Sequence, residues 1–207
     1  STGIEFKPDG TIMYVTGGLG FDYKIITYNL SIAWDLSTAT KSSVISIASP
    51  GGIRFKPDGT SAFILDFSNP DVIREFSIGT PWDLLTRGPI VRTLNITTPT
   101  GDNDILGFSF NSSGTKLFAT SEGSSSIYEF DLDAWKIDTA VFSYSFYVGD
   151  RLASPSDIFV KSDKEKFVVA GGPLDRIFEY KITSTAQGIT QVVNGSVSNI
   201  IITQPGV

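Results

Sequence analysis

The chain contains neither cysteine nor histidine. Without cysteine it can form no disulfide bond and no thiolate metal site. Without histidine it can build neither a Ser-His-Asp triad nor a Cys-His pair, and it lacks the usual general base near neutral pH. These absences leave carboxylates, lysine and tyrosine for any catalysis, and they favour binding over catalysis as the function.

Basic residues are in the minority, with 16 Lys and Arg against 22 Asp and Glu, so the net charge is −6. A surface of this sign repels phosphate backbones and anionic lipids, and we therefore expect no nucleic-acid partner. No apolar run approaches the roughly 18 residues of a membrane span, so we expect no membrane insertion. With 207 residues, 41% of them hydrophobic, the chain can bury one substantial core.

One segment of the sequence occurs four times. Its clearest line, Phe-Lys-Pro-Asp-Gly-Thr, spans Phe6–Thr11 and returns unchanged at Phe55–Thr60. It returns in weaker form at Phe110–Thr115 and at Val160–Glu165, so the spacings are 49, 55 and 50 residues. A repeat of this length is one supersecondary unit, which must stack on its neighbours to bury its apolar surface.

Each repeat reads as four short strands rich in β-branched and aromatic residues, and no segment shows a convincing helical stripe. A Pro-Asp-Gly turn joins the first two strands, and a Trp-containing link follows the third strand in three repeats. Four-stranded antiparallel repeats of this length are typical of β-propeller blades, whereas a β-sandwich needs no recurring line and a β-helix has shorter coils. For the first strand the expected copies are Gly3–Phe6, Gly52–Phe55, Leu106–Phe110 and Asp157–Val160.

We therefore expect an all-β fold, a β-propeller of about four four-stranded antiparallel blades, or an arc of a larger propeller. The propeller occupies residues 1–193, with repeats at about 3–51, 52–104, 105–156 and 157–193. The last strand of the fourth repeat is expected at Ile189–Val193. Residues 194–207 form a C-terminal strand or tail that latches the ring or contacts a neighbour.

The repeat resembles those of bacteriophage structural proteins and bacterial secreted propeller proteins. The resemblance is carried by Gly-Ile-x-Phe-Lys-Pro-Asp-Gly-Thr and by Trp-Asp-Leu, which run from Gly3 to Ala39 and from Gly52 to Leu85. It implies a propeller fold and a binding module on a virion or outside the cell. Because propellers host enzymes, scaffolds and receptors alike, the resemblance is specific for fold only.

Several acidic residues are candidates for chemistry. Asp66, Asp22 and Asp157 stand outside the repeated turns, and two convergent carboxylates could hydrolyse a glycoside. Asp9, Asp58 and Asp163 recur within the turns, which favours a role in turn formation over a metal or catalytic role.

Two further groups could bind a ligand. Asp102, Asn103 and Asp104 are oxygen-rich and could hold Ca²⁺, although they lack the alternating ligands of a calcium loop, so a solvated loop is favoured. The three tryptophans could stack on a sugar, but their constant place in the repeat favours packing between the third and fourth strands. They are Trp34, Trp82 and Trp135.

The sequence thus predicts a non-enzymatic structural or adhesive propeller module on a phage virion or extracellular assembly. We expect no catalytic, cofactor-binding or metal-binding residues and no cofactor. The expected partners are other protein subunits of an oligomer or larger complex, with surface glycans as a second candidate. Contacts would come from the loops that differ most between repeats, namely Gly17–Tyr23, Ser68–Asp71, Thr97–Asp104 and Gly149–Ser156. The alternatives are a carbohydrate-binding or carboxylate-dependent carbohydrate-active propeller, and an intracellular peptide-binding scaffold.

Overall fold

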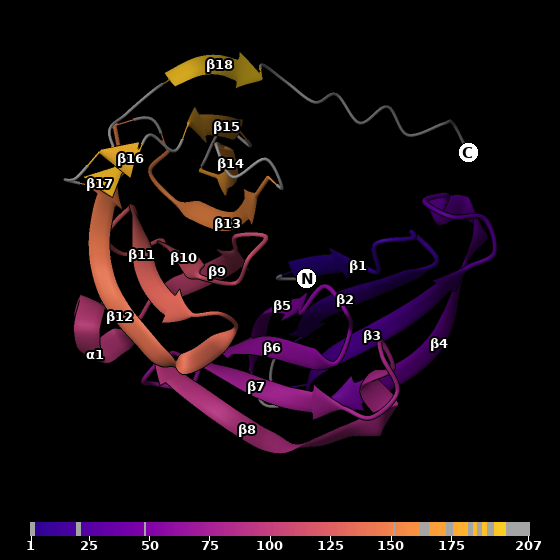
Figure 1. Ribbon diagram of the computed structural model, residues 1–207. Helices are drawn as coiled ribbons and strands as arrows, with labels where there is room; N and C mark the ends of the chain where they lie inside the picture. Colours follow the sequence, from indigo (N-terminus) through magenta and orange to yellow (C-terminus); the bar gives the residue numbers. More distant parts are fainter. Residues whose placement is uncertain are drawn as a thin grey trace.

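The computed structural model is an all-β protein in which four antiparallel four-stranded sheets are arranged in a ring, as a four-blade β-propeller (Figure 1). It describes residues 3–19, 22–47, 49–150, 152–161, 166–172 and 176–181, together with the short strands at 184–185, 188–189 and 193–197. No helix in these residues has the length and apolar character needed to cross a bilayer.

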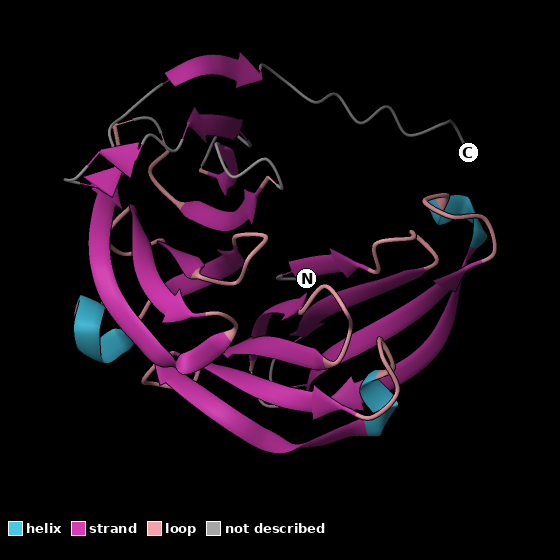
Figure 2. Ribbon diagram, viewed as in Figure 1, coloured by secondary structure: helices cyan, strands magenta, loops and turns pink. Residues whose placement is uncertain are grey.

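Each of the first three blades is a simple meander of four consecutive strands (Figure 2). Blade 1 consists of β1 (Gly3–Phe6), β2 (Ile12–Leu19), β3 (Asp22–Leu30) and β4 (Ala39–Ser46). Blade 2 consists of β5 (Pro50–Phe55), β6 (Ser61–Asp66), β7 (Val72–Ile78) and β8 (Arg87–Asn95). Blade 3 consists of β9 (Ile105–Phe110), β10 (Lys116–Ser121), β11 (Ser126–Asp133) and β12 (Lys136–Tyr147).

The fourth blade confirms the expected first three strands but not the fourth. It consists of β13 (Pro155–Val160), β14 (Lys166–Gly171), β15 (Arg176–Lys181) and β18 (Val193–Val197). The expectation of a strand at Ile189–Val193 was wrong, because a separate two-stranded hairpin of β16 (Ser184–Thr185) and β17 (Gly188–Ile189) intervenes. The strand paired with β15 therefore begins four residues later.

In the residues that the structure describes, helical structure is confined to three short pieces. The Trp-containing links carry single turns, η1 (Leu36–Thr38) and η2 (Leu84–Thr86), each capped by the side chain of the preceding aspartate, Asp35 or Asp83. The connection between blades 2 and 3 contains α1 (Thr97–Thr100), which accounts for the longer spacing of the second repeat.

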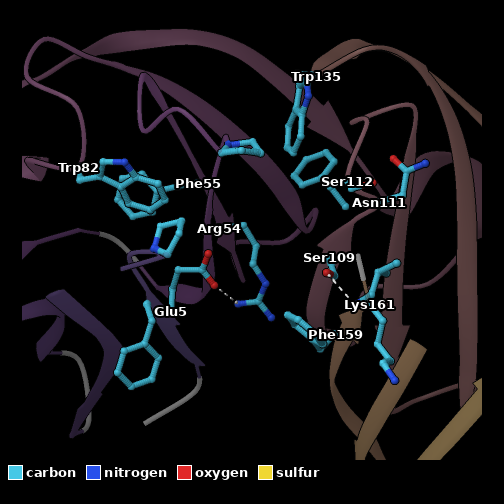
Figure 3. A pocket seen from close by; sticks show the side chains of 15 residues that line it. Glu5, Arg54, Phe55, Trp82, Ser109, Asn111, Ser112, Trp135, Phe159 and Lys161 are labelled. Carbon is cyan, nitrogen blue, oxygen red and sulfur yellow. Dashed lines mark hydrogen bonds and ion pairs between the residues drawn. The ribbon is translucent and has the colours of Figure 1, made fainter. Parts of the chain in front are cut away.

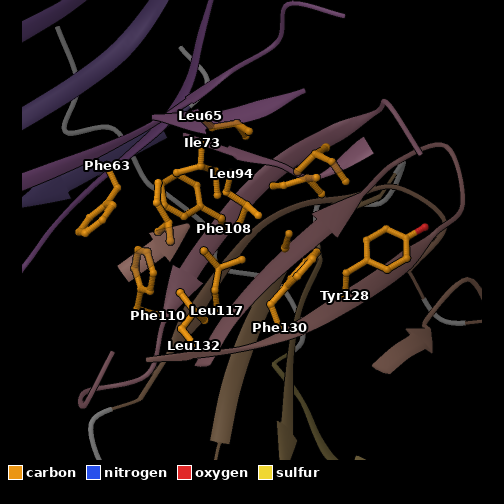
Figure 4. Packing of buried hydrophobic residues seen from close by; sticks show 14 residues of the cluster. Phe63, Leu65, Ile73, Leu94, Phe108, Phe110, Leu117, Tyr128, Phe130 and Leu132 are labelled. Atoms are coloured by element: carbon orange, nitrogen blue, oxygen red, sulfur yellow. The ribbon is translucent and has the colours of Figure 1, made fainter. Parts of the chain in front are cut away.

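Three hydrophobic cores lie between successive blades. We call the side of a blade that faces the preceding blade its leading face, and the opposite side its trailing face. In blades 1 and 2 the aromatic ring at the middle of the second strand, on the trailing face, packs against the first strand of the next blade. Tyr14 thus lies 4.7 Å from Phe55, and Phe63 lies 4.7 Å from Phe110 (Figure 4). Burial of such rings on both sheet faces is what holds successive blades together.

Candidate functional site

A pocket of 640 Å³ opens at the end of the ring where the Pro-Asp-Gly turns lie (Figure 3). Its wall comes from the innermost strands β1, β5, β9 and β13, from the turns that follow them, and from the Trp-containing links of blades 2 and 3. Each of the four blades contributes one or two aromatic rings to this wall, and the volume suits a small organic ligand. The rings are Phe6, Phe55, Trp82, Phe110, Trp135 and Phe159.

The innermost strands share one position at which every blade differs. Glu5, Arg54, Ser109 and Phe159 occupy the same register, each opposite the middle of the second strand of its blade. All four line the pocket. Position x of the repeated Gly-Ile-x-Phe segment is therefore a pocket-lining position whose residue type differs in every blade. This variable position was not considered in the sequence analysis, and a comparison of the repeats there would have identified Glu5 and Arg54 as candidate site residues.

Arg54 connects three blades at the centre of the ring. Its Nη2 atom donates to Asp157 Oδ1 at 2.8 Å and to the Ile158 carbonyl at 3.3 Å, and its Nη1 donates to the Ile53 carbonyl at 2.8 Å. Nη1 also lies 3.7 Å from Glu5 Oε2. The guanidinium, on a side chain only 10% exposed, is therefore a buried cation between two carboxylates.

Glu5 has the protonation behaviour expected of an acid–base group. Burial raises the pKa of Glu5 to about 7, against the lowering effects of the Arg54 charge and the Phe55 backbone N–H, and the Asp157 charge adds to the rise. A carboxyl group with a pKa close to neutrality, set in a concave site, can accept and return a proton.

Of the two acidic candidates outside the turns whose side chains the structure describes, Asp66 and Asp157, Asp157 contacts this centre, through Arg54. Asp66 is buried and engaged elsewhere, by an ion pair with Arg74 and by accepting from the Ser68 N–H at 2.9 Å. Asp22 begins β3, and its side chain lies outside the part of the chain that the structure describes.

The turn aspartates perform the local role expected of them. Oδ1 of Asp9 accepts from both the backbone N–H and the hydroxyl of Thr11, and Asp58 does the same with Thr60. A hydrogen bond from the neighbouring lysine, Lys7 or Lys56, is the largest cause that lowers the pKa of each to about 2. Asp163 lies outside the described residues.

The oxygen atoms of Asp102 are already engaged by the protein. Oδ2 accepts from Ser121 at 2.5 Å and from Tyr128 at 2.8 Å, and Oδ1 accepts from the Asp104 N–H at 3.0 Å. Within the described part of the chain, no three acidic side chains come together as metal ligands would. Asp102 anchors the loop before β9 to blade 3.

The tryptophans pack against the Pro-Asp-Gly turns, and two of them also line the pocket. In all three the backbone is left-handed, with φ between 64° and 67°, and the indole lies over the turn glycine. The described residues of the predicted contact loops, by contrast, do not line the pocket, because antiparallel pairing puts these loops at the opposite end of each sheet.

No protein-family model and no curated protein sequence matches this chain. Solved structures do match in fold. A candidate 6-phosphogluconolactonase from Bacteroides fragilis superposes with a TM-score of 0.60 at 13% identity, covering 94% of this chain and 70% of its own. A second, from Bacteroides uniformis, gives 0.60 at 11% identity with 92% and 70% coverage, and the Cps50 (Swd1) β-propeller domain from Myceliophteria thermophila gives 0.56 at 12% with 97% and 59%.

These likenesses confirm the propeller fold and correct the functional expectation. The sequence predicted a non-enzymatic structural or adhesive module of phage or secreted type. The neighbours at the highest TM-scores reported above carry the name of an enzyme instead, and nothing in the comparisons points to a virion or adhesive protein. The expectation had taken the missing histidine as an argument against catalysis, and a carboxyl group such as Glu5, whose pKa burial raises to about 7, weakens that argument.

Proposed function

We propose that this propeller is a hydrolase and that the pocket opens the ring of a small sugar-acid lactone. The observation that carries the proposal is Glu5, a carboxyl group with a pKa of about 7 held 3.7 Å from the Arg54 guanidinium in an aromatic pocket. The name of the similar Bacteroides structures supports this reaction class. The pocket also contains an exposed aromatic ring, Phe159, which is 62% exposed and suits the apolar face of a sugar ring.

The proposed chemistry needs one carboxylate and one water molecule. Ionised Glu5 takes a proton from water while the water oxygen bonds to the lactone carbonyl carbon. The bond from that carbon to the ring oxygen then breaks, and the ring oxygen takes the proton back from Glu5. The products are a carboxylic acid and a hydroxyl group on one open chain, so atoms and charge balance. Arg54 is a positioning residue, because its charge keeps the pKa of Glu5 from rising further.

The wall also contains a cation suited to a phosphorylated substrate. Lys161 lines the pocket and lies 3.7 Å from Glu179 Oε2, with its side chain 40% exposed. A phosphate group on the sugar would be attracted to this ammonium group.

The test is hydrolysis of glucono-δ-lactone and of its 6-phosphate, followed with a pH indicator against the spontaneous rate. Glu5→Gln should lower kcat by about 100-fold or more, the range for loss of a general base. The matched control is Glu122→Gln, an exposed carboxylate outside the pocket, which should leave the rate unchanged. Lys161→Ala should raise KM for the phosphorylated lactone alone. If both lactones are opened no faster than in buffer, or if Glu5→Gln keeps the rate, the proposal fails.

We also propose that the repeats of this protein are related to those of phage structural proteins and bacterial secreted propeller proteins. It is supported by the stretches from Gly3 to Ala39 and from Gly52 to Leu85. A location on a virion or outside the cell, and association with other protein subunits or surface glycans, belong to the same proposal. Immunogold labelling of the source organism or particle would test the location.

A further inference from the structure

The leading face of blade 1 is uncovered, although its residues match those of a buried interface. Blade 2 repeats the same sequence pattern, and there blade 1 covers the corresponding residues. The comparison is made position by position, because the strand registers of the two blades agree. The matched exposures are 50% for Ile4 against 0% for Ile53, 59% for Trp34 against 9% for Trp82, and 59% for Leu36 against 2% for Leu84.

The uncovered face already has the geometry of an occupied one. The rings of Phe6 and Trp34 lie 5.1 Å apart, close to the 4.8 Å between Phe55 and Trp82. Trp34 also keeps the left-handed backbone, with φ 66°, that Trp82 adopts at 67°. We call the pair of Phe6 and Trp34 the aromatic seat. It is preformed and lacks only the ring that would rest on it.

The two covered seats show which group that ring belongs to. On blade 2 the occupant is Tyr14, whose ring lies 4.7 Å from Phe55 and whose hydroxyl donates to the Trp82 carbonyl. On blade 3 the occupant is Phe63, at 4.7 Å from Phe110 and 6.1 Å from Trp135. In both cases the ring comes from the middle of the second strand of the preceding blade.

We propose that the leading face of blade 1 binds a further blade of this repeat, one that carries an aromatic ring at the middle of its second strand. We infer this partner from the interfaces between blades 1 and 2 and between blades 2 and 3. In both, the residues equivalent to Phe6 and Trp34 bind an aromatic ring from the second strand of the preceding blade. The similar solved structures are also longer than the part this chain matches, which spans 53% to 70% of them.

The fourth blade of a second copy is a poorer occupant. At the position of Tyr14 and Phe63 it has Val168, which pairs with Phe159 in the same register. A valine leaves the aromatic seat without its ring, so head-to-tail pairing of two copies would bury a cavity there.

The experiment extends the chain by one blade. A copy of residues 1–49 placed before Ser1 preserves the natural spacing of 49 residues and offers its own Tyr14 to the native seat. In the added copy Trp34 is replaced by Phe, so that only the three native tryptophans carry the 5-fluoro label for ¹⁹F NMR. The native Trp34→Phe variant identifies the Trp34 resonance. The matched control is the same extension with Tyr14→Ser in the added copy.

The readout is the H₂O/D₂O isotope shift of each fluorine resonance, which is large for an exposed indole. In the unextended chain we expect this shift at Trp34 but not at Trp82, whose unchanged resonance also shows that the protein is folded. The extension should abolish the shift at Trp34, and the Tyr14→Ser extension should restore it. Persistence of the shift in the extended chain overturns the proposal, as does equal burial by the Tyr14→Ser extension. Loss of the shift in the unextended chain at rising concentration would assign the face to a second copy instead.

Discussion

The indole of Trp82 lies directly over the α-carbon of Gly59. A β-carbon at this glycine would overlap the ring, and the Trp82 N–H donates to the Gly59 carbonyl at 3.1 Å. In each case the donor is the backbone N–H of the tryptophan, not the indole, and the same arrangement joins the other two tryptophans to Gly10 and Gly114. The fourth repeat has lysine at the glycine position and no tryptophan in its link, so glycine and tryptophan are present or absent together.

Gly59→Ala should therefore lower the free energy of unfolding by about 2–5 kcal/mol, the sum of left-handed backbone strain and overpacking against the indole. The matched control is Gly101→Ala, because Gly101 has a similar φ of 72° but nothing within 4 Å of an added β-carbon. It should lose only about 1 kcal/mol from strain. Urea denaturation measures both, and equal losses would mean that the indole makes no difference.

The hydroxyl of Tyr14 donates to the Trp82 carbonyl across the interface between blades 1 and 2. Tyr14→Phe keeps the ring but leaves that carbonyl unsatisfied, so we expect a loss of about 1–3 kcal/mol in the free energy of unfolding. Tyr147→Phe, at a side chain that is 61% exposed, should change it by less than about 0.5 kcal/mol. A loss no larger in Tyr14→Phe than in this control would contradict the assignment.

Removal of Arg54 should leave two carboxylates facing each other without a cation. We expect Arg54→Met to lower the free energy of unfolding by about 3 kcal/mol, and Glu5→Gln to recover part of the loss in the double variant. Lys136→Met, which breaks the exposed pair with Asp133, should cost at most about 1 kcal/mol. Additive losses in the double-mutant cycle would show that Glu5 and Arg54 do not interact.

The raised pKa of Glu5 predicts a pH dependence of stability with a definite sign. Between its ordinary value of 4.5 and about 7, the folded protein binds more protons at this group than the unfolded chain does. Its contribution to stability is therefore full below pH 4.5 and is lost as the pH rises to about 7. The difference in unfolding free energy between wild type and Glu5→Gln, measured in urea from pH 4 to 8, should fall across this window. Asp71, whose pKa burial raises to about 6, is common to both proteins and cancels. A difference that is flat or rises with pH would contradict the prediction.

The repeat made the fold predictable, because each first strand, turn and third strand recurs at a spacing of 49 to 55 residues. The sequence could not show that β18 rather than Ile189–Val193 completes the fourth blade. That choice depends on pairing with β15 across an intervening hairpin, which no local pattern records.

The site was less predictable for a related reason. Glu5 and Arg54 are 49 positions apart, and only the stacking of their blades puts them in contact. Asp157 was singled out in the sequence analysis, but its ion-pair partner Arg54 was not. Spacing along the chain does not show which side chains from different blades meet at the centre of the ring. The raised pKa of Glu5 results from burial, which is a property of the assembled blades.

The variable position of the innermost strands also has an evolutionary consequence. Glu5, Arg54, Ser109 and Phe159 are carried on one shared backbone register, whereas the interblade cores use the alternate residues of the same strands. Selection can therefore exchange the residue at this position one repeat at a time without repacking the apolar cores between blades, whereas a change at Arg54 also removes its polar contacts with blades 1 and 4. Duplication of a repeat would supply the framework, and a single codon in each copy would then diversify what the ring recognises.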